Sequence, residues 1–75
     1  MLKRIEANPD ICGGEPCVKG TRIPVSIVLS HLGAGEDVQT LLKNFPKLTL
    51  DDVYECLKFA SELAHEKVLP IEISR

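Results

Sequence analysis

Three cysteines and two histidines are the side chains of this 75-residue sequence best suited to metal binding or nucleophilic chemistry. Cys12 and Cys17 are separated by four residues, whereas Cys56 stands alone far along the chain. A structural zinc site needs four ligands that usually arrive as two close pairs, and neither His31 nor His65 lies near a cysteine. An odd number of cysteines also fits poorly with a closed set of disulfides. We therefore predict small apolar thiols in a reducing compartment, with no metal and no cofactor.

These side chains also do not form a recognisable catalytic set. No histidine or cysteine has a base or an orienting partner at motif spacing, and no glycine loop resembles a nucleotide cradle. The neighbouring carboxylates Asp51 and Asp52 are explained by helix capping, so paired-carboxylate catalysis is not needed to account for them. The sequence therefore predicts a binding protein rather than an enzyme, without a small-molecule substrate.

Basic side chains near the N-terminus are suited to nucleic-acid contacts. In Gly20-Thr21-Arg22, glycine lets another backbone approach, while the hydroxyl and the guanidinium can bind phosphate or guanine. The alternative is that Thr21 and Arg22 tie the ribbon to a helix terminus or to a carboxylate, which is common for arginine on small domains. The candidate DNA-binding residues are Arg4, Lys19, Thr21, Arg22, Lys47 and Thr49.

Acidic and apolar side chains near the C-terminus suggest a surface for a protein partner. Residues 49–66 hold five acids and one base, which repel a phosphate backbone but suit a basic protein surface. Residues 68–73 are apolar and alternate like a short strand, which either joins a partner or a sister subunit or pairs with residues 2–5 within a dimer. The candidate partner-binding residues are Asp51, Asp52, Glu55, Glu62, Glu66, Leu69, Ile71 and Ile73.

The chain that positions these residues divides at about residue 24 into two regions of different secondary structure. Residues 1–23 lack helical periodicity and are interrupted by proline and paired glycines, so we expect short β-strands that form a ribbon. Residues 24–67 are expected to form a helical bundle, and residues 68–75 a tail with a possible short strand. The whole chain is thus predicted to be one domain, 1–75.

Three helices are predicted within the bundle. The first is expected to start at Pro24 and to end at Gly33 and Gly35. The second follows the N-cap Asp37 and stops before Pro46. The third starts at a capping box, Thr49-Leu50-Asp51-Asp52, and its apolar stripe continues to about Lys67. The expected apolar positions are Val25, Val28, Leu29, Leu32, Val38, Leu41, Leu42, Phe45, Val53, Cys56, Leu57, Ala60, Leu63 and Ala64. Because the short corner 46–49 joins the last two helices, they form a helix-turn-helix candidate.

Composition bounds the class of protein further. The chain carries 9 basic and 11 acidic side chains, a net charge of -2, and 24 of its 75 residues are isoleucine, leucine, valine or phenylalanine. This apolar content exceeds that of disordered segments, yet no run approaches the roughly 20 residues that span a bilayer. The first six residues also lack the hydrophobic core of a signal peptide. We therefore expect a small cytoplasmic protein without membrane contact that needs a partner for full stability.

The run from residue 10 to residue 25 resembles the signature of the DUF433 family, because glycine, proline, glycine, threonine and arginine follow one another in the family's order. The similarity extends over residues 5–65 and includes Gly35 and the pairs Phe45-Pro46 and Leu48-Thr49. The signature positions are Gly14, Pro16, Gly20, Thr21, Arg22 and Pro24.

This resemblance implies a mainly α fold, namely a three-helix, homeodomain-like helix-turn-helix bundle preceded by a short N-terminal β-ribbon. It also implies an antitoxin of a type II toxin-antitoxin pair, which would bind and neutralise a PIN-like ribonuclease toxin and bind its own promoter DNA as a homodimer. The alternative is a small dimerisation or protein-interaction module with no DNA-binding role.

Overall fold

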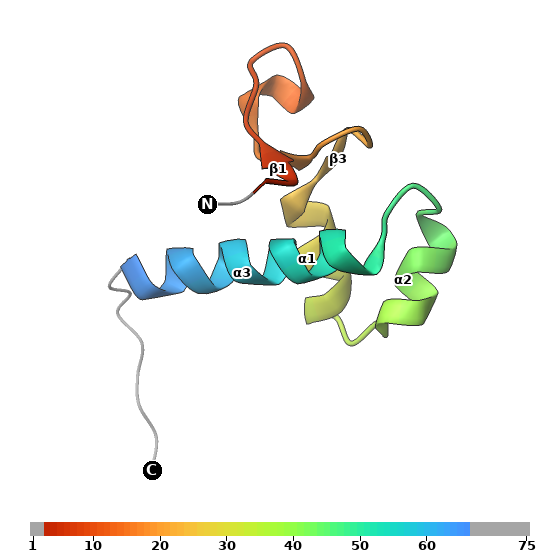
Figure 1. Ribbon diagram of the computed structural model, residues 1–75. Coiled ribbons are helices and arrows are strands. Elements are labelled where there is room, and N and C mark those ends of the chain that lie inside the picture. The colour runs from red at the N-terminus through yellow and green to blue at the C-terminus, as the bar shows by residue number, and fades with distance from the viewer. Residues whose placement is uncertain (1–2, 67–75) are drawn as a thin grey trace.

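The computed structural model describes residues 3–66 and begins with a small antiparallel sheet (Figure 1). The sheet has the order β1-β2-β3 and contains β1 (Ile5–Glu6), β2 (Cys17–Val18) and β3 (Ile23–Pro24). Val18 pairs with Ile5 on one side and with Ile23 on the other, and Cys17 pairs with Glu6 and Pro24. The predicted ribbon is therefore confirmed, and it is a three-stranded sheet rather than a single hairpin.

The two residues of the central strand face opposite sides of this sheet, as strand geometry requires. Val18 joins the helical core and is fully buried. Cys17 is also fully buried but lies against the thiol of Cys12, in the loop between β1 and β2. That loop contains a 3-10 turn, η1 (Cys12–Gly14). The loop thus covers the face of the sheet that the helices leave open.

Three helices follow, α1 (Val25–Gly33), α2 (Val38–Asn44) and α3 (Leu50–Glu66). Pro24 is the N-cap of α1 with an extended backbone, so the prediction that it is the first helical residue was wrong by one position. Its missing N–H suits the end of a strand at the edge of a sheet equally well. Asp37 caps α2 as predicted, because its side chain accepts a hydrogen bond of 2.7 Å from the Thr40 N–H.

The core lies where the sheet and the three helices meet. Its fully or nearly fully buried apolar members are Val18, Val25, Val28, Leu41, Leu48, Val53 and Cys56. The predicted apolar faces of α1 and α2 are confirmed, since every predicted position belongs to this core or packs against it. Leu48, before the cap of α3, and Val53, in its first turn, are both in the core, as expected for a hydrophobic staple.

The apolar stripe of α3 is buried over only part of its predicted length. Leu57 is 44% exposed, Leu63 is 39% exposed and Ala64 is exposed as well. Figure 1 also shows that the C-terminal part of α3 extends beyond α1. A helix of 17 residues is about 25 Å long and one of nine residues about 13 Å, so α1 cannot cover all of α3. The prediction that these three residues belong to the buried stripe was therefore wrong.

Candidate interaction surfaces

Arg4 and the first turns of α3 form the most highly charged cluster among residues 3–66. The Arg4 guanidinium lies 3.2 Å from an Asp52 oxygen, 3.6 Å from Asp51 and 3.7 Å from Glu55. The Arg4 backbone N–H also donates a 2.7 Å hydrogen bond to Glu55 Oε1. The start of the sheet is thus tied to the start of α3 by one cation and three carboxylates.

This cluster joins residues to which the sequence assigned different partners. Arg4 was a candidate for DNA, and the three carboxylates were candidates for a basic protein. In the folded chain they neutralise one another in part, so neither surface is as strongly charged as the sequence suggests. Asp51, 71% exposed at its side chain, remains the most accessible of the three acids.

The N-terminus of α3 is closed by the predicted capping box. The Asp52 N–H donates to Thr49 Oγ1 at 3.2 Å, and the Thr49 N–H donates to Asp52 Oδ2 at 2.9 Å. Asp52 is 6% exposed, so its carboxylate is held between a helix cap and the Arg4 guanidinium. Thr49 and Asp52 thus both have structural roles at this corner, whatever else they bind.

The turn between β2 and β3 presents two free cations on a fixed backbone. Thr21 Oγ1 donates to the Val18 carbonyl at 2.8 Å and accepts a 3.0 Å hydrogen bond from the Ile23 N–H. Its hydroxyl therefore stabilises the turn between two strands, and it does not make the predicted tie to a helix terminus or a carboxylate. Lys19 and Arg22 are exposed, and within residues 3–66 neither has an ion-pair partner.

The family-signature positions gather in the sheet and its connections. Gly20 has a φ of +79°, a conformation that glycine adopts without strain, and it precedes the Thr21 hydrogen bonds. The Pro16 carbonyl accepts a 2.9 Å hydrogen bond from the Val25 N–H at the start of α1. Much of the signature therefore has a structural explanation, and Arg22 is its one charged and exposed member.

The remaining predicted site residues are scattered. Lys47 is exposed at the corner between α2 and α3, and Glu62 is exposed on the C-terminal half of α3. Glu66 is the last residue of that helix. Leu69, Ile71 and Ile73 lie outside the described residues.

The surroundings of the two buried thiols, Cys17 and Cys56, favour the protonated form of the sulfur. Burial, followed by a hydrogen bond with the Cys12 thiol, raises the pKa of Cys17 to about 11. Burial, followed by the nearby charges of Asp52 and Glu55, raises the pKa of Cys56 to about 11. Cys12 is half-buried, and its Sγ donates to the Arg22 carbonyl at 3.2 Å. Within residues 3–66, no group of three or more His, Cys, Asp or Glu side chains is arranged so that it could hold a metal ion.

His31 is half-buried and joins α1 to α2. Its ring packs edge-on against Phe45 with the ring centroids 5.4 Å apart, and its Nδ1 lies 3.0 Å from Glu36 Oε1. These contacts suit the end of α1, because a helix C-terminus favours a group that can carry positive charge.

Among the described helices, none has the length and apolar character needed to cross a bilayer.

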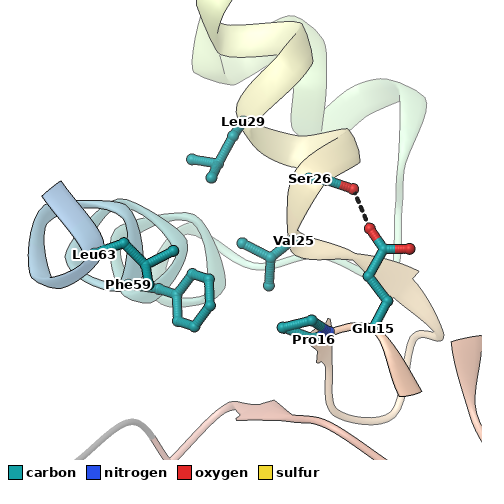
Figure 2. Close-up of a pocket in the computed structure, with 7 residues that line it drawn as sticks. All are labelled: Glu15, Pro16, Val25, Ser26, Leu29, Phe59 and Leu63. Carbon is teal, nitrogen blue, oxygen red and sulfur yellow. Dashed lines mark hydrogen bonds between the residues drawn. The ribbon is translucent and has the colours of Figure 1, made fainter. Parts of the chain in front are cut away.

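An apolar groove between α1, α3 and the loop before β2 was not predicted. Figure 2 shows Phe59 and Leu63 of α3 facing Val25 and Leu29 of α1, with Pro16 at one end. A hydrogen bond of 2.6 Å from Ser26 Oγ to Glu15 Oε1 closes the rim. The groove has a volume of about 180 Å³. The i, i+4 spacing of Phe59 and Leu63 is a signal in the sequence, but only the tertiary fold places these residues opposite Val25 and Leu29.

This architecture, three helices and a small N-terminal antiparallel sheet, places the protein among mainly helical domains. The chain belongs to the DUF433 family, because the family described as "Protein of unknown function (DUF433)" matches residues 5–60. The fold is similar to the crystal structure of a DUF433 member from Anabaena variabilis ATCC 29413, with a TM-score of 0.76 and 28% sequence identity. That similarity covers 84% of this chain and 62% of the other. The resemblance inferred from the signature is confirmed.

A second relative is similar over a shorter stretch. The uncharacterised protein y4eO of Sinorhizobium fredii (strain NBRC 101917 / NGR234) is 39% identical over 49 residues, which is 65% of this chain. The matched stretch spans 22% of that relative, about a fifth of its length. Similarity thus establishes the family and the fold, and the function has to be argued from the surfaces.

Proposed function

We propose that this protein is an antitoxin-like regulator that binds and neutralises a PIN-like ribonuclease toxin and, as a homodimer, binds its own promoter DNA. In this proposal α1, α2 and α3 act as a homeodomain-like helix-turn-helix unit. The observation that carries the proposal is the presence of two exposed charged surfaces on different elements. One is cationic, at the β2–β3 turn, and the other is on the outer face of α3, where the exposed acids Asp51 and Glu62 outnumber the exposed base Lys58.

The cationic turn is the better candidate for DNA. In most helix-turn-helix proteins the N-terminal residues of the recognition helix contact the bases. Here Asp51, Asp52 and Glu55 share the single cation Arg4, so a phosphate backbone would meet uncompensated negative charge. Lys19 and Arg22 are exposed, and the Thr21 hydrogen bonds hold the turn between them. A dimer would present two such turns, which strengthens phosphate binding.

The acidic face of α3 is the better candidate for the toxin. A ribonuclease binds a polyanion and therefore has cationic surfaces around its active site, which acidic side chains complement. Glu62 is exposed on the outer face of α3, and Asp51 is exposed near its start. A binding role of this kind needs neither a cofactor nor a catalytic group on the chain.

The DNA-binding part is tested by fluorescence anisotropy with the protein's own promoter over a range of salt concentrations. We expect Arg22→Ala to weaken binding by about tenfold and to lower the salt slope by about one. Lys58→Ala, an exposed lysine on α3, is the matched control and should leave both unchanged. The lack of a specific complex at low salt would contradict this part of the proposal, and an unchanged Arg22→Ala would contradict the role of the turn.

The toxin-binding part is tested by co-expression with the product of the adjacent reading frame. We expect a stable complex and loss of the partner's ribonuclease activity on added RNA. Glu62→Lys should weaken the complex at least about tenfold, because it places a cation against a cationic surface. Asp10→Lys makes the same charge change in the exposed loop before β2 and serves as the control. If the two proteins do not associate, the antitoxin role is wrong.

A protein-interaction module without DNA binding is the second candidate. It is favoured by the large apolar side chains exposed on the helices, since such residues mark protein contacts where they cluster. The exposed residues are Ile27, Leu50, Tyr54, Leu57 and Leu63. A complex with the partner protein, together with no promoter binding at any salt concentration, would favour this function.

A further inference from the structure

The groove between α1 and α3 is a concave apolar surface among the described residues. Its walls are Val25 and Leu29 on one side and Phe59 and Leu63 on the other (Figure 2). An apolar cavity of about 150 Å³ accommodates a molecule the size of benzene, so about 180 Å³ has room for one or two branched aliphatic side chains. The groove is therefore suited to aliphatic groups from a polypeptide.

The spacing along the groove favours an extended segment. Phe59 and Leu63 are four residues apart on a helix, about 6 Å along its axis, and the same holds for Val25 and Leu29. Alternate side chains of an extended strand are about 6.6 Å apart and point to the same side. Two side chains at positions i and i+2 of such a segment thus match the spacing of Phe59 and Leu63 along α3.

The edges of the sheet offer a poorer place for the same segment. The Arg4 N–H, beside β1, already donates to the Glu55 carboxylate. At the other edge, Pro24 of β3 has no N–H, and the Ile23 N–H donates to Thr21. A strand added at either edge would find few free backbone donors, whereas the groove needs apolar side chains only.

Residues 67–75 supply a segment of this chemistry next to the groove. They follow Glu66 directly, about 4.5 Å of helix beyond Leu63, and contain Ile71 and Ile73 at the i, i+2 spacing. Pro70 does not fit a helix interior, so the sequence does not continue α3 through these isoleucines. Residues 67–70 can span up to about 14 Å, enough to reverse direction and return to Leu63 and Phe59.

We propose that this chain's own residues 71–73 bind in the α1–α3 groove and place Ile71 and Ile73 between Leu29, Phe59 and Leu63. Because the segment is tethered, its effective concentration at the groove is in the millimolar range, which compensates for a small contact area. The proposal does not rest on the antitoxin function. It adds that a partner that binds Ile71 and Ile73 must first compete with the groove.

The direct test is NMR on the full chain with labelled isoleucine and leucine methyl groups. We expect nuclear Overhauser contacts from the Ile71 or Ile73 methyls to the Phe59 ring, and unchanged intensity on dilution. In a mixture of labelled and unlabelled chains these contacts should remain within one chain. Contacts that occur only between chains would assign the groove to a second copy, and the lack of any contact would leave it uncovered. Either result would overturn the proposal.

A double-mutant cycle tests the same contact without relying on NMR resonance assignments. Ile71→Ser should lower Tm by about 5 °C, the size of shift expected when one buried aliphatic side chain is lost from a small domain. In a Leu63→Ala background the same change should have no effect. Leu57→Ala is the matched control, because Leu57 lies on the same helix with similar exposure but does not line the groove. An equal loss of Tm in all three backgrounds would contradict the proposal.

Discussion

Asp51 and Asp52 are chemically identical neighbours with different physical roles. Asp52 is 6% exposed, accepts the Thr49 N–H and lies 3.2 Å from the Arg4 guanidinium. Asp51 points to solvent, with its nearest Arg4 nitrogen at 3.6 Å. An exposed ion pair contributes little, whereas removing a buried acceptor leaves donors without partners.

Replacing these two residues separately should therefore give different losses of stability. We expect Asp52→Ala to lower the free energy of unfolding by about 2 kcal/mol, since both the helix cap and the buried acceptor are lost. Asp51→Ala should cost less than about 1 kcal/mol, because only an exposed pair and a favourable dipole contact are removed. Urea denaturation curves, fitted with one m-value for the wild type and both variants, measure the two losses of stability. Equal losses would show that the capping box does not carry the difference.

The sequence could predict one part of this cluster but not the other. The capping box depends on residues three apart, so Thr49 and Asp52 could be recognised from their spacing. The Arg4 contacts join residues 48 positions apart in the chain. Only the tertiary fold brings them together, and therefore the same acids appeared from the sequence as a free surface.

The end of α1 shows how a single backbone conformation defines an element boundary. The Gly35 N–H donates to the Leu32 carbonyl at 3.0 Å, and the Glu36 N–H donates to the His31 carbonyl at 3.1 Å. This pair of hydrogen bonds is a Schellman motif with Gly35 at the C′ position, where its φ is +94°. Gly33, by contrast, is the last helical residue.

The two glycines should therefore respond in opposite ways to alanine. We expect Gly35→Ala to cost about 1 kcal/mol, since its Cβ would meet no atom within 4 Å but the left-handed backbone strains any L-residue. Gly33→Ala should stabilise by about 0.5 kcal/mol, because its Cβ is equally unobstructed and alanine loses less entropy in a helix. Thermal unfolding of both variants checks this. A loss of stability at Gly33 would mean that helix propensity does not control this end.

Helix periodicity predicted the apolar faces of α1 and α2 well, since every predicted position belongs to the core or packs against it. For α3, the same pattern included Leu57, which is exposed although Cys56 and Phe59 beside it are buried or half-buried. Periodicity records which side of a helix is apolar, but not how far the neighbouring helix reaches. Leu57 and Leu63 thus look like core residues in the sequence and are about two-fifths exposed in the fold.

At the scale of the whole molecule, charge is divided along the chain. Residues 1–25 carry four bases and three acids, and residues 26–75 carry five bases and eight acids. Arg4 bridges the two parts by pairing with α3, which leaves Lys19 and Arg22 as the exposed cations of the β2–β3 turn. The charges of Arg4 and its three acidic partners therefore stabilise the fold, whereas those of Lys19 and Arg22 are exposed to solvent. The buried thiols of Cys17 and Cys56 add a second contribution to stability, and this one depends on pH.

Cys17 and Cys56 should make the folded state sensitive to alkaline pH. Both have a pKa of about 11 when folded, above the ordinary value of 9.0, because burial disfavours the thiolate. Below pH 9 both states keep their protons, so stability is at its full value. Between pH 9 and 11 the unfolded chain releases protons that the folded chain retains, and the free energy of unfolding falls as pH rises.

The measurement is Tm as a function of pH from 7 to 11 for the wild type and for the variant Cys17→Ala, Cys56→Ala. We expect the variant to be less stable at pH 7, because two buried side chains are truncated. Its Tm should nevertheless fall less steeply above pH 9, since the two buried thiols are gone while the lysines and Tyr54 are unchanged. Taking the difference between the two slopes therefore removes the contribution of the lysines and Tyr54. Parallel slopes above pH 9 would show that the buried thiols do not control alkaline stability.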